Sequence, residues 1–232
     1  MAIKFYLAMM AEEISDFPDL PENSAFIYHI YPDIFQEIPM SGIAVLTDFF
    51  PVQPDFAQSV AQWIRQWSCE AVVLDFQNPK YEEAEGFVRL LQTYVSCPVV
   101  VSEIYAAQMD CPVFLPPLPH HKSLKDHLTP WQGREIWMDL SPLPEQLLLT
   151  QQGCSSHYDF SLPPCCPVHV NAHLHCHYSI TLEEDCAAFT FWRTDDDLTA
   201  LLLELEEAGV HHAIGLHQEW TKKNRPGFPE RF

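Results

Sequence analysis

The sequence predicts an α/β protein whose residues 1–232 form a single domain, an irregular (β/α)8 barrel of the TIM type. Short apolar runs alternate along the chain with amphipathic segments of helical period, and there are eight such runs. No glycine-rich phosphate loop follows any of them, and the chain holds only 7 glycines. An open, doubly wound sheet is the alternative architecture.

Each predicted strand is a near-continuous apolar run, as expected of parallel strands that are covered on both faces. The first, IKFYLAM, and the fourth, AVVLDF, show this character most clearly. The gap between the second and third runs is too short for a full helix, so the barrel is expected to be irregular. In chain order the predicted strands are 3–9, 25–30, 42–49, 71–76, 98–105, 134–140, 187–192 and 211–216.

Helical segments separate several of these strands. Residues 54–67 begin with a proline suited to a first helical turn, and their aromatic and aliphatic side chains share one face. Residues 81–95 repeat that pattern. The segment 194–209 opens with Thr194 as a cap and closes with Gly209 beyond its end. Residues 141–186 are long and rich in proline, cysteine and histidine, which predicts a β-hairpin-like insertion.

Composition excludes several classes of partner. The chain has 32 acidic and 12 basic side chains and a formal net charge of −20, which argues against nucleic acid and against anionic membrane surfaces. No apolar run reaches the length of a membrane span, and the first residues lack the apolar core of a signal peptide. We therefore expect a cytoplasmic protein. Its 8 cysteines, without a CxxC motif, are expected to be mostly small buried side chains. The oligomeric state stays open.

Polar side chains stand at the predicted carboxyl ends of the strands, where barrel enzymes place their chemistry. Carboxylate pairs serve glycoside cleavage, and flat aromatic rings stack on sugars. These residues predict a site for a small-molecule or oligosaccharide ligand, with no cofactor. They are the carboxylates Asp48, Asp75, Glu103 and Asp139, the amide Gln77, the cation Arg193, and the aromatic residues Trp137 and Trp192.

Two segments resemble motifs of the chitinase-like family 18 glycoside hydrolases. EAVVLDFQ (70–77) resembles the fourth-strand motif D-G-x-D-x-D-W-E, with Asp75 at the third acid and Gln77 at the catalytic glutamate. AAFTFWRTDD (187–196) resembles the segment of the last strand, whose sugar-stacking tryptophan would correspond to Trp192. The resemblance implies a barrel with a sugar-sized cleft.

The departures from the family motif bear on activity. Gln77 can donate a hydrogen bond but has no titratable proton, and Val73 stands in place of another acid. The first hypothesis is therefore a catalytically degenerate barrel that binds a carbohydrate or a related small ligand. The second is an active glycoside hydrolase that uses Asp75 with Glu103 or Asp139 as the second carboxyl group.

A third hypothesis is a metal-dependent enzyme built on HVNAHLHCHY (169–178). If this segment is one strand, its side chains His173, His175 and His177 share a face and could hold a transition metal. Further donors nearby in the sequence are Cys165, Cys166 and Asp185. The simpler interpretation, which we favour, is a hydrated polar face of a hairpin that binds no metal.

Overall fold

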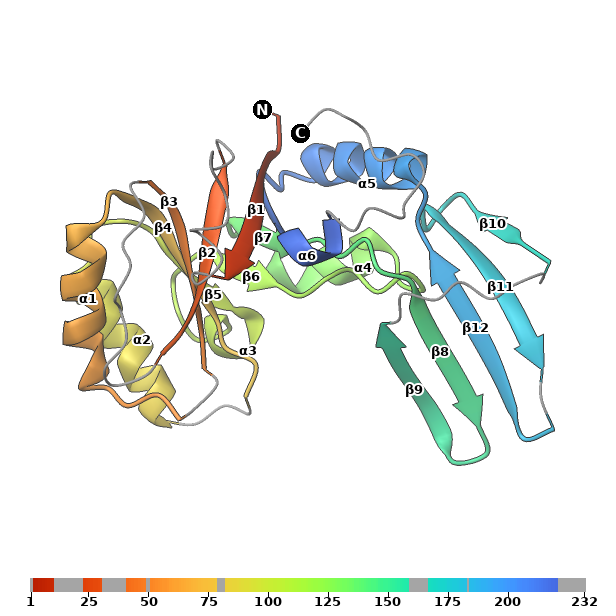
Figure 1. Cartoon of the computed structure of the whole chain (residues 1–232), viewed down its shortest axis with the longest axis horizontal. Helices are drawn as coiled ribbons and strands as arrows, with labels where there is room; N and C mark the ends of the chain where they lie inside the picture. The colour runs from red at the N-terminus through yellow and green to blue at the C-terminus, as the bar shows by residue number, and fades with distance from the viewer. Residues whose placement is uncertain are drawn as a thin grey trace.

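The computed structural model describes residues 2–10, 23–30, 41–48, 51–78, 82–158, 167–182 and 184–220. Figure 1 shows a barrel flanked by helices, from which a flat sheet projects to one side. Within the described residues, no helix is long and apolar enough to cross a membrane.

The barrel is closed and consists of eight parallel strands, which confirms the predicted fold class. Neighbouring strands pair in the order β1-β13-β7-β6-β5-β4-β3-β2. The strands are β1 (Lys4–Met10), β2 (Ser24–His29), β3 (Gly42–Thr47), β4 (Cys69–Asp75), β5 (Val99–Ser102), β6 (Val113–Leu115), β7 (Ile136–Asp139) and β13 (His212–Leu216).

One predicted barrel strand is wrong. The segment 187–192 is not in the barrel, and the place left open is taken by the three-residue strand β6. Residues 187–192 instead belong to β12 (Cys186–Trp192), the central strand of a five-stranded antiparallel sheet. A central strand has neighbours on both sides, so its apolar run looks like that of a parallel barrel strand.

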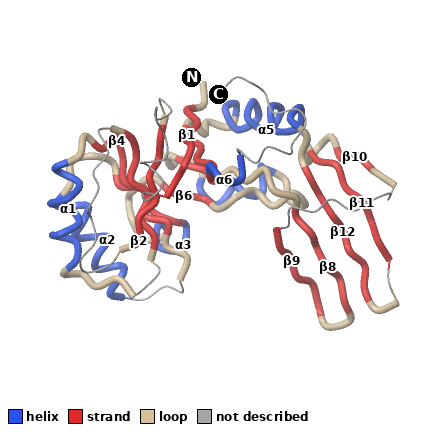
Figure 2. The backbone as a smooth tube through the Cα atoms, in the orientation of Figure 1, coloured by secondary structure: helices blue, strands red, loops and turns tan. Residues whose placement is uncertain are grey.

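This second sheet is the insertion, and it lies between β7 and β13 in the chain. It begins close to the predicted residue 141 and extends beyond 186 to the end of β12. Figure 2 shows its strands side by side and away from the barrel. In addition to β12 it contains β8 (Glu145–Thr150), β9 (Gly153–Tyr158), β10 (His169–Asn171) and β11 (Cys176–Leu182).

Helices follow where the periodicity predicts them. In α1 (Phe56–Gln66) the side chains of Val60, Trp63 and Ile64 form the buried face. In α5 (Asp195–Glu207) the Thr194 hydroxyl accepts a hydrogen bond from Asp197 N, and the Asp197 carboxylate accepts one from Thr194 N at 2.8 Å, a reciprocal cap. The other helices are α2 (Glu82–Tyr94), α3 (Glu103–Ala106), α4 (Leu124–Leu128), η2 (Thr129–Trp131) and α6 (His217–Trp220).

The core has two layers. The larger lies between the barrel and its helices, and the smaller fills the inside of the barrel with alternate side chains of each strand. The barrel is therefore a packed body, not a pore. The buried inner residues are Tyr6, Ala8, Ala25, Ile27, Ile43, Val45, Ala71, Val73, Val100, Phe114, Trp137 and Ile214.

Candidate functional site

A polar layer lies on top of the inner core at the carboxyl end of the barrel. Successive side chains of a strand point to opposite faces, so a residue two places after an inner apolar residue also points inward. At the last residue of five strands this rule selects polar side chains. We call them the mouth layer: His29, Thr47, Asp75, Ser102 and Asp139.

Asp48 anchors the loop that follows β4. It comes directly after β3 and is buried, with 3% of its surface exposed. Its two carboxylate oxygens accept hydrogen bonds from the backbone N–H groups of Gln77 at 3.0 Å and Asn78 at 3.3 Å. Both oxygens are thus used inside the protein. Asp48 therefore positions Gln77, a role that differs from the predicted contact with a ligand.

Gln77 in turn is directed at Asp75. Its side-chain Nε2 lies 3.2 Å from each carboxylate oxygen of Asp75 and donates a hydrogen bond there. Burial raises the pKa of Asp75, the Gln77 hydrogen bond lowers it, and the charge of Asp48 raises it further; the net shift is upward. The amide at this position thus supports the charged form of Asp75 but has no proton to transfer.

Asp139 is the second carboxyl group of the mouth layer. Burial raises its pKa well above the ordinary value, and the charges of Asp75 and Glu219 raise it further. The N–H of Leu140 opposes this with a smaller effect. Glu219 lies in α6, directly after the last barrel strand, and the sequence analysis did not select it. Asp75 and Asp139 thus form a pair of interacting acids.

Glu103 occupies a different part of the same end. It follows β5 directly and begins α3, so the parallel topology places it at the carboxyl end, as predicted. Its charge, however, acts on His127 of α4, whose pKa is lowered by burial against this opposing influence. The charges that act on Asp75 and Asp139 do not include that of Glu103. These charge interactions favour Asp139 over Glu103 as the partner of Asp75.

His29 and Thr47 complete the layer, and the sequence analysis missed both. His29 Nδ1 lies 2.5 Å from Thr47 Oγ1, so the two side chains form a hydrogen bond between β2 and β3. A sequence signal for both exists. Alternate residues of a strand point inward, and His29 and Thr47 come two places after the inward residues Ile27 and Val45. His29 adds an imidazole ring, which can donate or accept hydrogen bonds, to a layer that otherwise contains acids and hydroxyls.

Trp137 lies at the wrong end of the barrel for the predicted ligand contact. It is the second residue of β7, near the amino end, and only 3% of its surface is exposed. Its ring stacks on His212 with centroids 4.1 Å apart and on Tyr6 at 5.8 Å. Its Nε1 donates to Glu135 Oε1 at 2.8 Å. Trp137 therefore fills the closed end of the barrel interior.

Trp192 and Arg193 do not stand at a barrel strand end, because β12 belongs to the insertion. Trp192 stacks on His177 of the adjacent strand, with ring centroids 6.0 Å apart. Arg193 is buried, with 7% exposed, and its Nη1 donates to the Leu118 carbonyl at 3.3 Å. The predicted ligand contacts of both residues rested on the wrong strand assignment.

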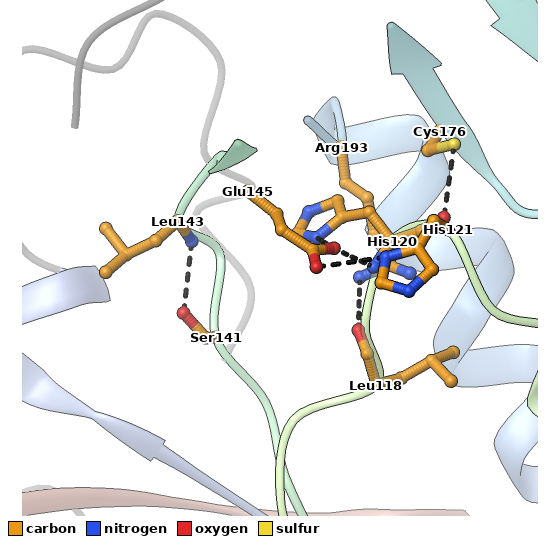
Figure 3. A network of polar contacts seen from close by, with 8 residues as sticks. All are labelled: Leu118, His120, His121, Ser141, Leu143, Glu145, Cys176 and Arg193. Carbon is orange, nitrogen blue, oxygen red and sulfur yellow. Dashed lines mark hydrogen bonds and ion pairs between the residues drawn. The ribbon is translucent and has the colours of Figure 1, made fainter. Parts of the chain in front are cut away.

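Arg193 is part of a buried junction between the insertion and the loop after β6 (Figure 3). Glu145, the first residue of β8, accepts a hydrogen bond from the backbone N–H of His120 at 2.7 Å. Its other oxygen lies 3.0 Å from His121 Nδ1. Burial lowers the pKa of His120 to about 4, so this ring is neutral at pH 7. The junction fixes the start of the insertion sheet relative to the barrel.

Tyr158 is the aromatic side chain that the insertion brings toward the mouth layer. It ends β9 opposite Glu145, and 42% of its surface is exposed. Burial of its hydroxyl raises the pKa of Tyr158 to about 12, the charge of Glu145 adds to this, and the charges of Asp139 and Glu219 contribute further. An exposed ring within the electrostatic reach of Asp139 is thus supplied by β9 and not by Trp192.

The segment 169–178 is not one strand, so the geometric basis of the metal hypothesis is wrong. It forms β10, a turn and the start of β11, and His175 has a φ of 46°. His175 Nε2 pairs with Glu204 at 2.8 Å and His177 Nδ1 with Asp197 at 2.9 Å, while His173 lies in the turn. No three His, Cys, Asp or Glu side chains of the described ranges are arranged to hold a metal. Cys165 and Cys166 lie outside those ranges.

Comparison with known proteins identifies the fold. No family model matches the sequence, and no curated protein matches it either. Solved structures do match. The Bacillus cereus spore cortex-lytic enzyme SleL superimposes with a TM-score of 0.59 at 10% identity, over 97% of this chain and 72% of that one. A family 18 N-acetylglucosaminidase from Paenibacillus barengoltzii gives 0.57 at 7% identity, over 93% and 94% of the two chains.

A mutant family 18 chitinase from Cycas revoluta, solved in complex with (GlcNAc)4, gives a TM-score of 0.50 at 11% identity, over 91% of this chain and 94% of that one. At these identities the likeness concerns the fold. The chain has the barrel of the family 18 glycoside hydrolases, as the resemblance of residues 70–77 implied.

Proposed function

We propose that the protein binds a carbohydrate, or a related small polar ligand, at the mouth layer and does not hydrolyse it. The observation that carries this proposal is the amide of Gln77, held by Asp48 and directed at both oxygens of Asp75. In the family motif this place belongs to the acid that protonates the leaving group. An amide there keeps hydrogen-bonding capacity and loses acid catalysis.

The surroundings of Asp75 support binding without hydrolysis. Val73, which replaces an acid of the motif, is a buried hydrocarbon side chain without an ionisable group, so it cannot assist a proton transfer. Asp75, His29 and Thr47 together offer acceptors and donors of the kind that match sugar hydroxyl and amide groups. The half-exposed ring of Tyr158 in the insertion, whose pKa responds to the charge of Asp139, offers an apolar face.

The structural neighbours support the ligand class. Two of them are described as an N-acetylglucosaminidase and as a chitinase with bound (GlcNAc)4, so ligands of this barrel in other proteins are amino-sugar oligosaccharides. We therefore take chito-oligosaccharides as the first probes.

Calorimetric titration with chito-oligosaccharides of two to four sugars tests the proposal. The unmodified protein is expected to bind, and Asp75→Ala is expected to weaken the affinity about tenfold or more, since lost hydrogen bonds to a charged group cost roughly 1.5–3 kcal/mol. The control is Asp196→Asn, which changes an exposed carboxylate on α5. No binding of any oligosaccharide, or equal weakening in both variants, would overturn the proposal.

Hydrolysis by Asp75 and Asp139 is the second candidate, and one observation favours it. The pKa of Asp139 is raised well above its ordinary value and that of Asp75 is raised less, and glycoside cleavage uses two carboxyl groups whose pKa values differ. Release of the aryl group from aryl chito-oligosaccharides measures this activity. We expect none from the unmodified protein and at most a trace from Gln77→Glu. Robust activity that disappears in Asp139→Asn or Glu103→Gln would replace binding as the function.

A further inference from the structure

Two cysteine side chains lie next to each other near the amino end of the barrel, opposite the mouth layer. Cys69 is the first residue of β4, and Cys97 lies two residues before β5. These strands are parallel neighbours with Val72 opposite Val99, so the two cysteines stand at nearly the same level. Both are free thiols of intermediate exposure and pack against the core between the barrel and its helices.

The two thiols influence each other's ionisation. They share a hydrogen bond, which raises the pKa of Cys69 and lowers the pKa of Cys97 below that of an ordinary thiol. Cys69 Sγ also lies 2.8 Å from the carbonyl oxygen of Ala71, so a proton is held on Cys69. This division singles out Cys97 as the nucleophile of the pair. Among the other free thiols of the described residues, Cys111 and Cys176 are buried, Cys186 is of intermediate exposure and Cys154 is exposed.

We propose that Cys69 and Cys97 form a reactive dithiol that low-molecular-weight disulfides oxidise to an intramolecular disulfide. Cys97 is the attacking residue because its pKa is the lowered one of the pair, and Cys69 resolves the intermediate because it lies at nearly the same level on the neighbouring strand. The site is distinct from the mouth layer and does not depend on what the mouth binds.

The reaction balances in two exchange steps. The Cys97 thiolate attacks one sulfur of a small disulfide RSSR, an S–S bond forms between Cys97 and R, and RS⁻ leaves. Cys69 then loses its proton to solvent and attacks the Cys97 sulfur, which forms the Cys69–Cys97 bond and releases a second RS⁻. The two thiolates released take up protons, so the protein loses two electrons and RSSR is reduced to two RSH.

Adjacent strands make the second step favourable. A disulfide needs Cα atoms roughly 4.4–6.8 Å apart, a separation that neighbouring strands provide. The bond would close the chain between residues 69 and 97, a loop that contains all of α2. The oxidised form is therefore expected to unfold at a higher denaturant concentration than the reduced form.

Peptide mapping in glutathione buffers tests this proposal. The reduced, full-length protein is held at increasing ratios of oxidised to reduced glutathione, quenched with acid, alkylated, digested and analysed by mass spectrometry. We expect a linked peptide pair that joins Cys69 and Cys97. Cys154, exposed on β9, serves as the internal comparison and should carry glutathione instead. A stable glutathione adduct on Cys97 in the unmodified protein, without the link to Cys69, would overturn the proposal.

Two serine variants assign the roles. In Cys69→Ser the glutathione adduct on Cys97 should accumulate, because nothing resolves it. In Cys97→Ser the remaining Cys69 should stay reduced under the same conditions. Equal rates of modification at the two positions would contradict the assigned roles. Circular dichroism shows whether each variant is folded, and if one is not, the mapping of the unmodified protein decides alone.

Discussion

The two ends of the barrel are built from the same strands but in opposite ways. At the amino end Trp137 stacks with Tyr6 and His212, and Lys4 pairs with Glu70 at 2.7 Å. At the carboxyl end the same interior contains Asp75 and Asp139, whose negative charges repel each other. The amino end is thus filled with apolar side chains and an ion pair. The carboxyl end contains acids whose mutual repulsion lowers the stability of the fold.

This difference separates folding from binding along each strand. In β7 the inward side chains are Trp137 and, two residues later, Asp139, so one strand serves both ends. The packed end stabilises the fold and leaves no room for a ligand. The acidic end contributes little to folding, and groups that cost stability there are typical of a functional site.

The largest effect is expected from the packed end. Trp137→Ala should lower the free energy of unfolding by about 3–5 kcal/mol, because a large buried ring leaves a cavity among Tyr6 and His212. Urea unfolding followed by circular dichroism measures this. Trp192→Ala, which changes a less buried ring in the insertion, is the matched control and should cost clearly less. A loss below about 1 kcal/mol for Trp137→Ala would break the comparison.

At the acidic end, by contrast, a substitution should raise the free energy of unfolding. Asp139 has a raised pKa in the folded protein, so both states are protonated below about pH 4 and the unfolded chain loses its proton first as the pH rises. The contribution of Asp139 to stability therefore falls from about pH 4 upward, until the pH passes the folded pKa. Asp139→Asn removes this decline.

We expect Asp139→Asn to raise the free energy of unfolding at pH 7, because the raised pKa of Asp139 means that burial of its charged form lowers stability there. Near pH 4 the difference should nearly vanish. Urea unfolding at both pH values measures it, and Asp196→Asn on α5 serves as the control. A variant that is less stable than the unmodified protein at pH 7 would show that the Asp139 carboxylate stabilises the fold.

The smallest effect concerns the ion pair at the packed end. Lys4 and Glu70 are 38% and 45% exposed, and exposed pairs contribute about 0–1 kcal/mol. Lys4→Met keeps an unbranched side chain and removes the ammonium group, which lies 4.8 Å from the centroid of the Tyr6 ring. Its unfolding free energy at pH 7 should stay within about 0.5 kcal/mol of the original. A larger loss would mean that charge, and not stacked rings, closes this end.

Strand prediction succeeded for seven of the eight barrel strands and failed for the shortest, β6. The runs around Val73 and Val45 predicted β4 and β3 because several apolar residues follow one another. The three residues of β6 are too few to stand out, so the run at 187–192 was taken for a barrel strand. Local patterns report burial, and they do not say which sheet buries a strand.

The candidate site also has a part that the sequence predicts and a part that only the tertiary structure reveals. The sequence by itself determined the fold class, the insertion, and the acids at the ends of β3, β4, β5 and β7, because residue order and strand alternation decide which end and which face a side chain occupies. Only the tertiary structure decided that the charge of Asp75 acts on Asp139, that Trp137 fills the closed end, and that the charge of Asp139 reaches Tyr158 of the insertion. These relations join residues distant in sequence, and strand pairing across the closed barrel and packing of the insertion against it bring them together.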